Sequence, residues 1–555
     1  MSDTTDSGPV LAADGTPLKR SLNRALRAQK MRALALIAPL LIFVLVTFIA
    51  PIADMLFRSV ENQIVSNTLP NAVATLNDWD GTGDTVPGEE TFEALYYDMF
   101  LAAESKRHTR LGSRLNYEEA GISSMFRTSG RRVDDVGEDQ VGALEDIDDS
   151  WEDEAFWFAL MSGADGAAKA DDIIEAQRTR LSKLNETGFS GDVGFAPSQE
   201  IADLLPRTVR AYSAFAVFTA IADGDVVAEE EPWEAVKVAL IEDLRSGADL
   251  SGYDGPGAEE LRAAQDGMAD QPAIDYKQAF LDMNEDWGDL DNWKTIKMYA
   301  PPFTEGYFLN AVDMQKTPEG FQARPESEQI YIKLFKRTLF MSLMITGSCI
   351  LLAYPVAFLL ANLPMRTSSL LMILVLLPFW TSLLVRTSAW KVMLQQQGVI
   401  NDTLVWLGLV DDASRLVMIN NQFGTIVAMT HILLPFMILP MYSVMSTIPP
   451  YYVRAAKSLG ATNWTAFWRV YFPQSVPGIG AGSILVFILA IGYYITPEIV
   501  GGTTGTFISN RIAYHISTSL NWGLAAALGS ILLAAVLILY WAYDKIVGID
   551  NVKLG

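Results

Sequence analysis

The chain has 555 residues, a formal net charge of −24 and a single cysteine, and its mean hydropathy is positive. This combination excludes a single soluble domain, a bare bundle of membrane helices and a scaffold held by disulfides. The acidity lies in one block, because residues 58–330 carry 55 Asp and Glu against 22 Lys and Arg. We therefore expect a membrane part joined to an acidic domain.

Six uncharged runs each have the length of a membrane helix. A bilayer core about 30 Å thick needs roughly 20 helical residues. The fourth run is longer than one span needs, but its ends are polar or broken by proline. The six runs cover residues 33–53, 338–365, 367–385, 416–453, 470–497 and 516–543. They predict an all-α membrane protein with six transmembrane helices.

The first run also has an alternative reading as a cleaved secretory signal, since basic residues precede it. Its 21 uncharged residues exceed a typical signal core, and no small-x-small cleavage site follows. We therefore expect a retained transmembrane helix over 33–57. Six basic residues precede it: Lys19, Arg20, Arg24, Arg27, Lys30 and Arg32.

The basic flank predicts the orientation of the chain in the membrane. It indicates a cytoplasmic N-terminal segment over 1–32, and six spans then return the C-terminus to the same side. Several basic residues oppose this on the outer loops, among them Lys333, Arg386 and Arg415. The flanks of long translocated domains are weak topology signals, so we keep the orientation. Residues 58–332 are then expected in the periplasm of a bacterial inner-membrane protein.

The acidic block has the pattern of a folded helical domain. Residues 171–184 and 231–246 space apolar side chains as amphipathic helices do, and the run 211–222 is too short to cross a bilayer. Five tryptophans supply material for a core: Trp151, Trp157, Trp233, Trp287 and Trp293. Its acidity suits solubility of an exposed domain, or attraction of a cationic ligand or basic partner.

One segment of this block, DMNEDWGDLDN at 282–292, spaces oxygen ligands as a hard cation needs. An EF-hand loop requires glycine at its sixth position, where Trp287 stands, so we expect no metal site there. The lone Cys349 falls within the second span, where packing is its expected role.

The loop between the fourth and fifth spans, 449–478, has the signals of two short helices. Pro449 and Pro450 end the fourth span, and YYVRAAKSL then runs to Gly460, which suits the left-handed residue that closes a helix. Thr462 or Asn463 can cap a second helix. Pro473 and Pro477 are expected to stop that helix before the fifth span. The helix has an aromatic face made of Trp464, Phe467, Trp468 and Tyr471.

This stretch resembles the EAA loop of the permease subunits of ABC importers, in which E-A-A is followed by three residues, glycine, nine residues and I-x-L-P. Ala455 and Ala456, Gly460 and Pro473 match that spacing, whereas Arg454 replaces the usual Glu. The resemblance implies contact with a separate ATPase through Arg454, Ala455, Ala456, Leu459, Gly460, Phe467 and Pro473. An interfacial helix lying on lipid headgroups is the alternative reading.

Four further stretches resemble the first permease subunit of spermidine/putrescine ABC transporters: 376–394, 398–410, 431–443 and 494–502. The resemblance implies a type I ABC importer permease fold with helices two to six in 333–555. The large helical insertion between the first two helices departs from that subfamily. The implied partners are a second homologous permease chain, two copies of an ATPase, a periplasmic substrate-binding protein and membrane lipid, with no nucleic acid.

The chain has no G-x-x-x-x-G-K-[ST] stretch, the motif of a phosphate-binding loop, and no catalytic constellation of nucleophile and base. We therefore expect a transporter subunit without a cofactor. ATP and magnesium are then held by the partner ATPase. Polar residues within membranes often line a substrate path. On that ground the candidates are Trp380, His431, Tyr494 and Glu498, with packing, interfacial or solvated roles as alternatives. A secondary transporter and a membrane-anchored sensor remain the other function classes.

Overall fold

The chain folds into two compact units, which are described separately. The computed structural model describes residues 18–81, 83–317 and 320–547, so the first 17 residues of the expected cytoplasmic segment lie outside the described part. Unit 1 comprises residues 1–60, 306–314 and 321–555, and unit 2 comprises residues 61–305 and 315–320. A two-stranded sheet is formed by β1 (Met314–Thr317) and β2 (Gly320–Ala323).

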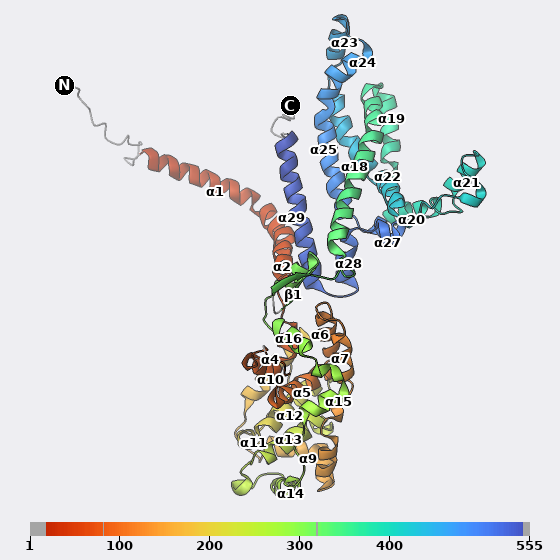
Figure 1. Cartoon of the computed structure of the whole chain (residues 1–555). Coiled ribbons are helices and arrows are strands. Elements are labelled where there is room, and N and C mark those ends of the chain that lie inside the picture. Colours follow the sequence, from red (N-terminus) through yellow and green to blue (C-terminus); the bar gives the residue numbers. More distant parts are fainter. Residues whose placement is uncertain (1–17, 82, 318–319, 548–555) are drawn as a thin grey trace, which may run out of the picture. The chain divides into compact units, whose positions relative to one another are not determined.

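Unit 2 is a domain of short helices, as the amphipathic patterns predict (Figure 1). Its longer helices are α5 (Glu89–Glu104), α10 (Asp171–Asn185), α12 (Pro206–Phe218), α13 (Glu234–Arg245) and α14 (Ala258–Met268). Its shorter helices are α3 (Ile64–Thr68), α4 (Pro70–Asp78), α6 (His108–Leu115), α7 (Ile122–Ser129), α8 (Glu138–Glu145), α9 (Glu154–Ser162), α11 (Gln199–Leu204), α15 (Tyr276–Met283) and α16 (Leu290–Met298).

Aromatic side chains form the core of unit 2. Trp151, Trp157, Trp287 and Trp293 are completely buried, while Trp233 is half-buried. The Trp287 and Trp293 rings lie 5.2 Å apart. Aromatic pairs at such distances add to the free energy already gained by burying apolar area. The tryptophans expected to form a core therefore do so, with Trp233 at its edge.

The oxygen-rich segment 282–292 is built as helix caps. The Asn284 side chain accepts a hydrogen bond from the Asp286 amide, and the Asp289 side chain accepts one from the Asp291 amide. Trp287 is buried between them and donates from its indole nitrogen to Ser129. In the part of the chain that the structure describes, no group of three or more His, Cys, Asp or Glu is placed to hold a metal ion.

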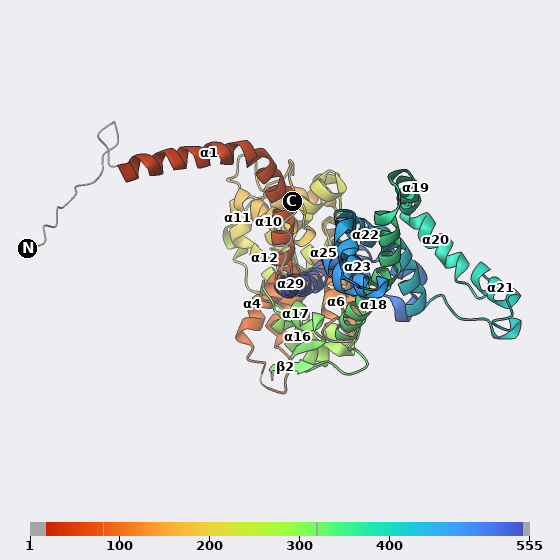
Figure 2. The same ribbon diagram turned by 90° about the horizontal axis from the view of Figure 1, so that it is seen from above.

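The centre of unit 1 is a bundle of three long helices, α18 (Tyr331–Asn362), α22 (Gln422–Ser446) and α25 (Phe472–Gly492) (Figures 1 and 2). The three helices pack directly on one another. Gly478 of α25 lies so close to α22 that an added Cβ would stand 3.1 Å from the Met441 Cα. Such small-residue contacts let membrane helices approach closely. Cys349 is buried here, as its packing role requires.

Further helices complete unit 1. The first span is α1 (Leu18–Val44) continued through a π-helical turn into α2 (Ala50–Arg58), and α2 packs against α29 (Trp522–Val547). The remaining helices are α17 (Gly306–Ala311), α19 (Met365–Leu376), α20 (Leu383–Met393), α21 (Val399–Trp406), α23 (Pro450–Ser458), α24 (Asn463–Ala466), α26 (Ile495–Val500), α27 (Gly502–Gly505) and α28 (Ile508–Ser517).

Five helices among the described residues are long and apolar enough to cross a membrane. They are Gln29–Arg58, Tyr331–Asn362, Gln422–Ser446, Asn463–Gly492 and Trp522–Tyr543. The third predicted span differs, because Met365–Trp380 and Leu383–Met393 meet at 93°. Counting this bent pair as one span gives six. The Ser382 side chain accepts a hydrogen bond from the Val385 amide and so caps the second helix of the pair. A new helix therefore begins at a point where the uncharged run continues without a break.

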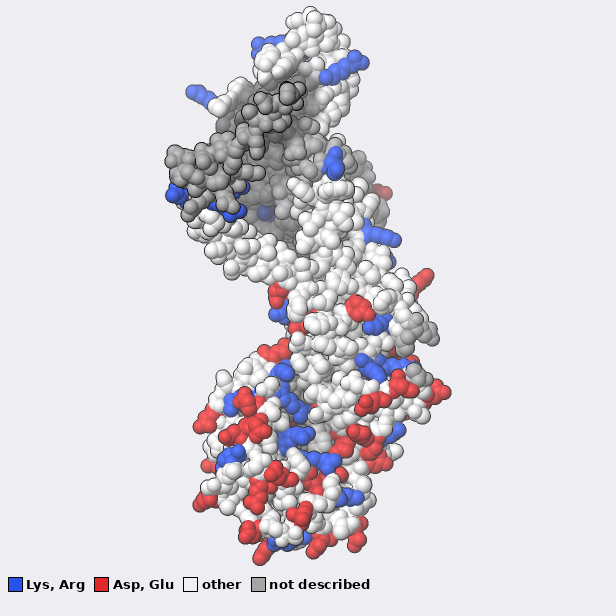
Figure 3. Space-filling model, turned by 90° about the vertical axis from the view of Figure 1, so that its left-hand side faces the viewer, with Lys and Arg blue, Asp and Glu red and all other residues white. Residues whose placement is uncertain are grey.

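The two units differ in surface chemistry. Figure 3 shows carboxylates and basic side chains over the surface of unit 2, while the described helices of unit 1 present mostly uncharged atoms. In unit 1 the exposed side chains include Leu36, Leu351, Leu370 and Ile538, which lie on the predicted spans. Apolar side chains facing outward are stable in lipid, so this surface suits a bilayer.

Candidate coupling loop and polar cluster

The first helix of the loop between the fourth and fifth spans ends at a glycine in the left-handed conformation. Gly460 has φ +92°. Its amide donates to the Lys457 carbonyl, and the Ala461 amide donates to the Ala456 carbonyl, each at 3.0 Å. This pair of bonds is a Schellman motif, in which glycine is favoured because it has no Cβ. Gly460 therefore turns the chain as its position in the sequence predicts.

The outer face of α23 is exposed and mixes basic with apolar groups. Arg454 and Ala455 are exposed and Ala456 is half-buried, while Leu459 keeps 89% of its surface accessible. Beyond the turn, Trp464 is 71% exposed. Large exposed apolar side chains beside each other are typical of contact surfaces. The loop thus offers a compact apolar face with basic residues around it.

The inner face of the loop packs against the second predicted span. Thr462 caps α24 by accepting a hydrogen bond from the Thr465 amide. Phe467 and Tyr471 then contact Phe358 of α18, with ring centroids 5.8 and 5.1 Å apart. Tyr354, one turn earlier on α18, is hydrogen-bonded to the Ser475 hydroxyl of α25 at 3.0 Å. The loop is therefore joined to α18, a contact that the sequence alone did not reveal.

The expectation that Pro473 and Pro477 stop the second helix before the fifth span is wrong. α24 continues through a π-helical turn, Phe467–Tyr471, into α25, and the whole stretch Asn463–Gly492 is one helix. The Phe472 amide donates to the Phe467 carbonyl, five residues back. Pro473 then falls at the start of the next α-helical stretch, where the missing amide hydrogen breaks fewer bonds.

Polar side chains of α20, α22, α26 and α28 form a second site in unit 1. Trp390 of α20 donates from its indole nitrogen to Nδ1 of His431 in α22, at 3.1 Å. The Thr387 hydroxyl of α20 lies 3.1 Å from the Thr496 hydroxyl of α26. Hydrogen bonds between helices stabilise packing in an apolar medium. The bent α20 is thus held against α22 and α26 by two polar contacts.

The same cluster contains a carboxylate. The Asn510 side chain of α28 donates to a Glu498 carboxylate oxygen at 2.5 Å and to the Tyr494 carbonyl at 2.9 Å. Glu498 is nevertheless exposed. The Asn510 amide therefore orients the carboxylate without covering it. Three of the four candidate path residues, His431, Tyr494 and Glu498, take part in these contacts.

Two further residues of this region take no part in these hydrogen bonds. Trp380 is 73% exposed and stands at the end of the 3₁₀ turn Leu377–Trp380, apart from the hydrogen bonds of the cluster. Arg386 of α20 was placed on an outer loop, yet its Nε and Nη1 atoms are buried without a hydrogen-bond partner among the described residues. A membrane arginine is normally partnered. In the sequence, Arg386 is only a single charged residue directly after the uncharged run 367–385, a pattern that does not indicate burial.

The region around this core matches a known family. Residues 339–547 match the family described as "Binding-protein-dependent transport system inner membrane component". The chain is 33% identical over 222 residues to the spermidine/putrescine transport system permease protein PotB of Salmonella typhimurium strain SL1344, covering 40% of this chain and 77% of that protein. The PotB of Escherichia coli K12 is 32% identical, covering 40% of this chain and 80% of that protein.

Solved structures show weaker likeness. A crystal structure of a bacterial alginate ABC transporter with an alginate-bound periplasmic protein matches at 20% identity and a TM-score of 0.32, over 39% of this chain and 78% of that chain. An amino acid ABC transporter structure matches at 16% identity and a TM-score of 0.26, over 40% of this chain and 93% of that chain.

The fold and the loop therefore define a permease, and the chain belongs to the family of binding-protein-dependent transport system inner membrane components. Within this family it is an ABC importer permease resembling the spermidine/putrescine permease PotB. It is a multi-pass inner-membrane protein and a transporter component rather than an enzyme. Unit 2 lies outside the residues that the family model matches.

Proposed function

We propose that this chain forms part of the translocation path for a polyamine or a related cationic solute, and that its loop couples the path to a separate ATPase. The observation that carries the coupling role is the contact of Phe467 and Tyr471 with Phe358. A force applied to α23 passes through this aromatic contact to α18 and along the continuous helix to α25. The exposed outer face is the surface that an ATPase groove would cover.

The charge at the docking face is reversed relative to the usual family pattern. Arg454 stands where Glu is usual, and it is exposed. An acidic group on the partner would complement it, since complementary charges steer association and select partners. In this proposal the helix-turn geometry of the family is retained, and Arg454 pairs with an acidic group of the partner.

The proposed partners are a second permease chain, two ATPase copies holding ATP and magnesium, and a periplasmic substrate-binding protein. The N- and C-termini would be cytoplasmic, with residues 58–332 periplasmic, so that α23 faces the ATPase. The polyamine assignment rests on the two PotB relatives at 32–33% identity. Glu498 would offer its carboxylate to the cation, while Arg386 would repel it. The cargo would therefore pass on the Glu498 side of the cluster.

Purification under mild detergent tests the proposal. We expect the tagged chain to carry an ATPase and a second permease, and the reconstituted complex with its binding protein to accumulate spermidine or putrescine only with ATP. Uptake without any nucleotide-hydrolysing subunit would instead make the chain a secondary transporter. If the complex hydrolyses ATP but accumulates neither polyamine, the chain is still an ABC importer subunit, but the proposed polyamine cargo is wrong.

A further inference from the structure

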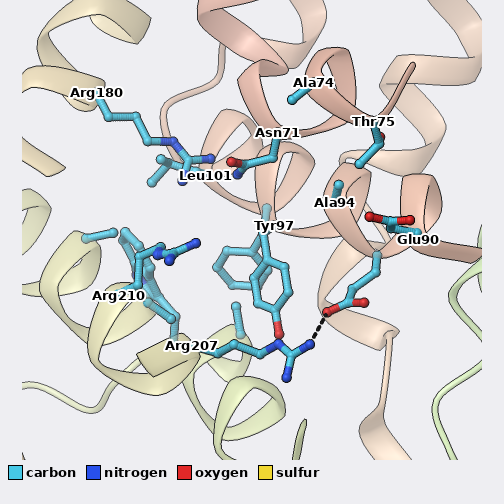
Figure 4. A pocket seen from close by; sticks show the side chains of 16 residues that line it. Asn71, Ala74, Thr75, Glu90, Ala94, Tyr97, Leu101, Arg180, Arg207 and Arg210 are labelled. Carbon is cyan, nitrogen blue, oxygen red and sulfur yellow. Dashed lines mark ion pairs between the residues drawn. The ribbon is translucent and has the colours of Figure 1, made fainter. Parts of the chain in front are cut away.

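Unit 2 contains a cavity of about 590 Å3, a volume typical of small-molecule sites. Four helices line it, namely α4, α5, α10 and α12, together with Trp233 and Ala235 at the start of α13. Figure 4 shows the side chains of Arg180, Arg207 and Arg210 gathered on one side and Glu90 on the other. The walls between them are apolar. This cavity belongs to none of the sites described above.

Two of the three arginines are held by carboxylates of the protein. Arg207 pairs with Glu93 at 3.3 Å and donates to the Ser246 hydroxyl at 2.8 Å. Arg180 donates from Nη2 to Asp98 at 2.6 Å. Burial raises the pKa of Asp98 to about 6, although Arg180 and backbone amides oppose the rise. Asp98 is therefore ionised at neutral pH and fixes the Arg180 side chain in place.

Spare donors nevertheless remain at this end of the cavity. Asp98 also accepts hydrogen bonds from the Asn71 amide, the Asn71 side chain and the Ala72 amide, so it engages Arg180 through one nitrogen only. Arg210 makes no ion pair or hydrogen bond with the described residues and is exposed. A planar guanidinium with free N–H groups binds carboxylates in two-point geometry. The arginine side of the cavity therefore has spare N–H donors, although Asn71 and Glu93 of the lining also offer acceptor oxygens.

Aromatic groups and an unpartnered hydroxyl form the middle of the cavity. The Phe100 and Trp233 rings lie 5.8 Å apart in its wall. The Tyr97 hydroxyl is buried and makes no hydrogen bond of normal geometry with the described residues, although the Tyr276 side chain lies near enough to lower its pKa. Burial raises the pKa of Tyr97, so the hydroxyl stays protonated at neutral pH and is a donor. A buried donor without a partner is costly, and a ligand acceptor would remove that cost.

We propose that this cavity binds a small organic carboxylate with an aromatic or branched apolar body. The carboxylate accepts hydrogen bonds from Arg210 and from the spare N–H groups of Arg180. The apolar body packs against Phe100 and Trp233, with the Tyr97 hydroxyl nearby. A polyamine fits less well, because the guanidinium group of Arg210 is unpaired and only one carboxylate of the lining, Glu90, has no arginine partner. The cargo proposed for the membrane part and this ligand are therefore different molecules.

Titration calorimetry on the purified full-length protein tests this site. The probes are phenylacetate, indole-3-acetate and hexanoate, with phenylacetamide and phenethylamine as neutral and cationic matches of the first and spermidine as a polyamine. We expect saturable binding of at least one carboxylate, and binding at least tenfold weaker for phenylacetamide and phenethylamine. Tighter binding of phenethylamine or spermidine, or no saturable binding of all three carboxylates, would overturn the proposal.

Matched variants locate the binding. Arg210→Gln should weaken carboxylate binding at least about tenfold, because charge-assisted hydrogen bonds are lost. Arg131→Gln is the control, since Arg131 is an exposed arginine of unit 2 outside the cavity. Tyr97→Phe should weaken binding by a smaller factor. Unfolding temperatures without ligand monitor folding in each variant. Equal affinities for Arg210→Gln and Arg131→Gln would contradict the assignment.

Discussion

Phe467 of the loop lies edge-on against Phe358 of α18, with ring centroids 5.8 Å apart and an interplanar angle of 80°. These residues are more than a hundred positions apart in the sequence, and they join the exposed loop to the packed bundle. An edge-to-face pair adds about 0.5–1.5 kcal/mol beyond the area it buries. The pair is thus a direct mechanical contact between the loop and a predicted membrane span.

Phe467→Ala is expected to separate ATP hydrolysis from uptake. The exposed face of the loop that is proposed to contact the ATPase would be unchanged, but the aromatic contact with α18 would be lost. ATP hydrolysis should therefore persist while the uptake per ATP hydrolysed falls several-fold. Reconstituted vesicles assayed for both quantities measure the ratio. Trp406→Ala is the control, because Trp406 is 82% exposed on α21 and outside the loop. Equal losses of hydrolysis and uptake would point to failed assembly instead.

Gly460 tests whether the turn itself matters. An added Cβ would meet no atom within 4 Å at Gly460 or at Gly347, so alanine at either position creates no steric clash with neighbouring residues. Only Gly460 has a positive φ, and Ala there is expected to cost about 1 kcal/mol of backbone strain. Gly460→Val should lower uptake more than Gly460→Ala, since β-branched residues avoid this conformation.

Two comparisons complete the Gly460 test. Gly460→Asn should retain most uptake, because Asn tolerates the left-handed region. Gly347→Ala should have little effect, because Gly347 lies within the α-helix α18. Transport measured in vesicles of equal protein content decides between the cases. Unchanged uptake in Gly460→Val would remove the conformational requirement.

The features that the sequence predicted well are those controlled by nearby residues. Gly460 ends a helix and Thr462 caps the next through bonds that span at most five positions. The buried tryptophans of unit 2 were expected because large apolar groups gain most from leaving water. Hydropathy located the spans for the same reason, since each run alone is long enough to cross a bilayer.

The features that it missed depend on packing between distant segments. The π-helical turn before Pro473 removes a break that the prolines alone predict. Trp390 became a partner of His431 only because α20 bends away from α19 by 93°. Arg386 was expected on a loop, but it lies within α20 and is half-buried. Hydropathy did not register the bend, because the uncharged run 367–385 continues across it into the start of α20.

Glu498 tests the proposed cationic path. Glu498→Gln removes the charge but leaves an oxygen to accept from Asn510, so the local structure should persist. We expect KM for polyamine uptake to rise about tenfold, with ATP hydrolysis by the assembled complex unchanged, because one carboxylate–ammonium contact is lost. Asp411→Asn, at an exposed carboxylate of another loop, is the control. A KM unaffected by Glu498→Gln would place the path elsewhere.

His515 of α28 is expected to make the stability of the permease core depend on pH. The ring is buried, with Nε2 3.0 Å from the Tyr331 hydroxyl and Nδ1 2.8 Å from the Ser519 hydroxyl. Burial, and then the charge of Arg511, lower the pKa of His515 from 6.5 to about 4. The unfolded chain therefore binds a proton that the folded chain does not, and stability falls as the pH drops through this interval.

The loss attributable to His515 should reach roughly 2 kcal/mol between pH 6.5 and pH 4. Unfolding of the detergent-purified protein, followed at pH 7.5, 6.5, 5 and 4, measures it. His515→Gln keeps hydrogen-bonding groups but does not titrate, so its stability should fall less over the same range. His108, whose pKa burial also lowers, is present in both proteins and cancels from the difference. Parallel pH profiles for the two proteins would show that His515 does not carry the dependence.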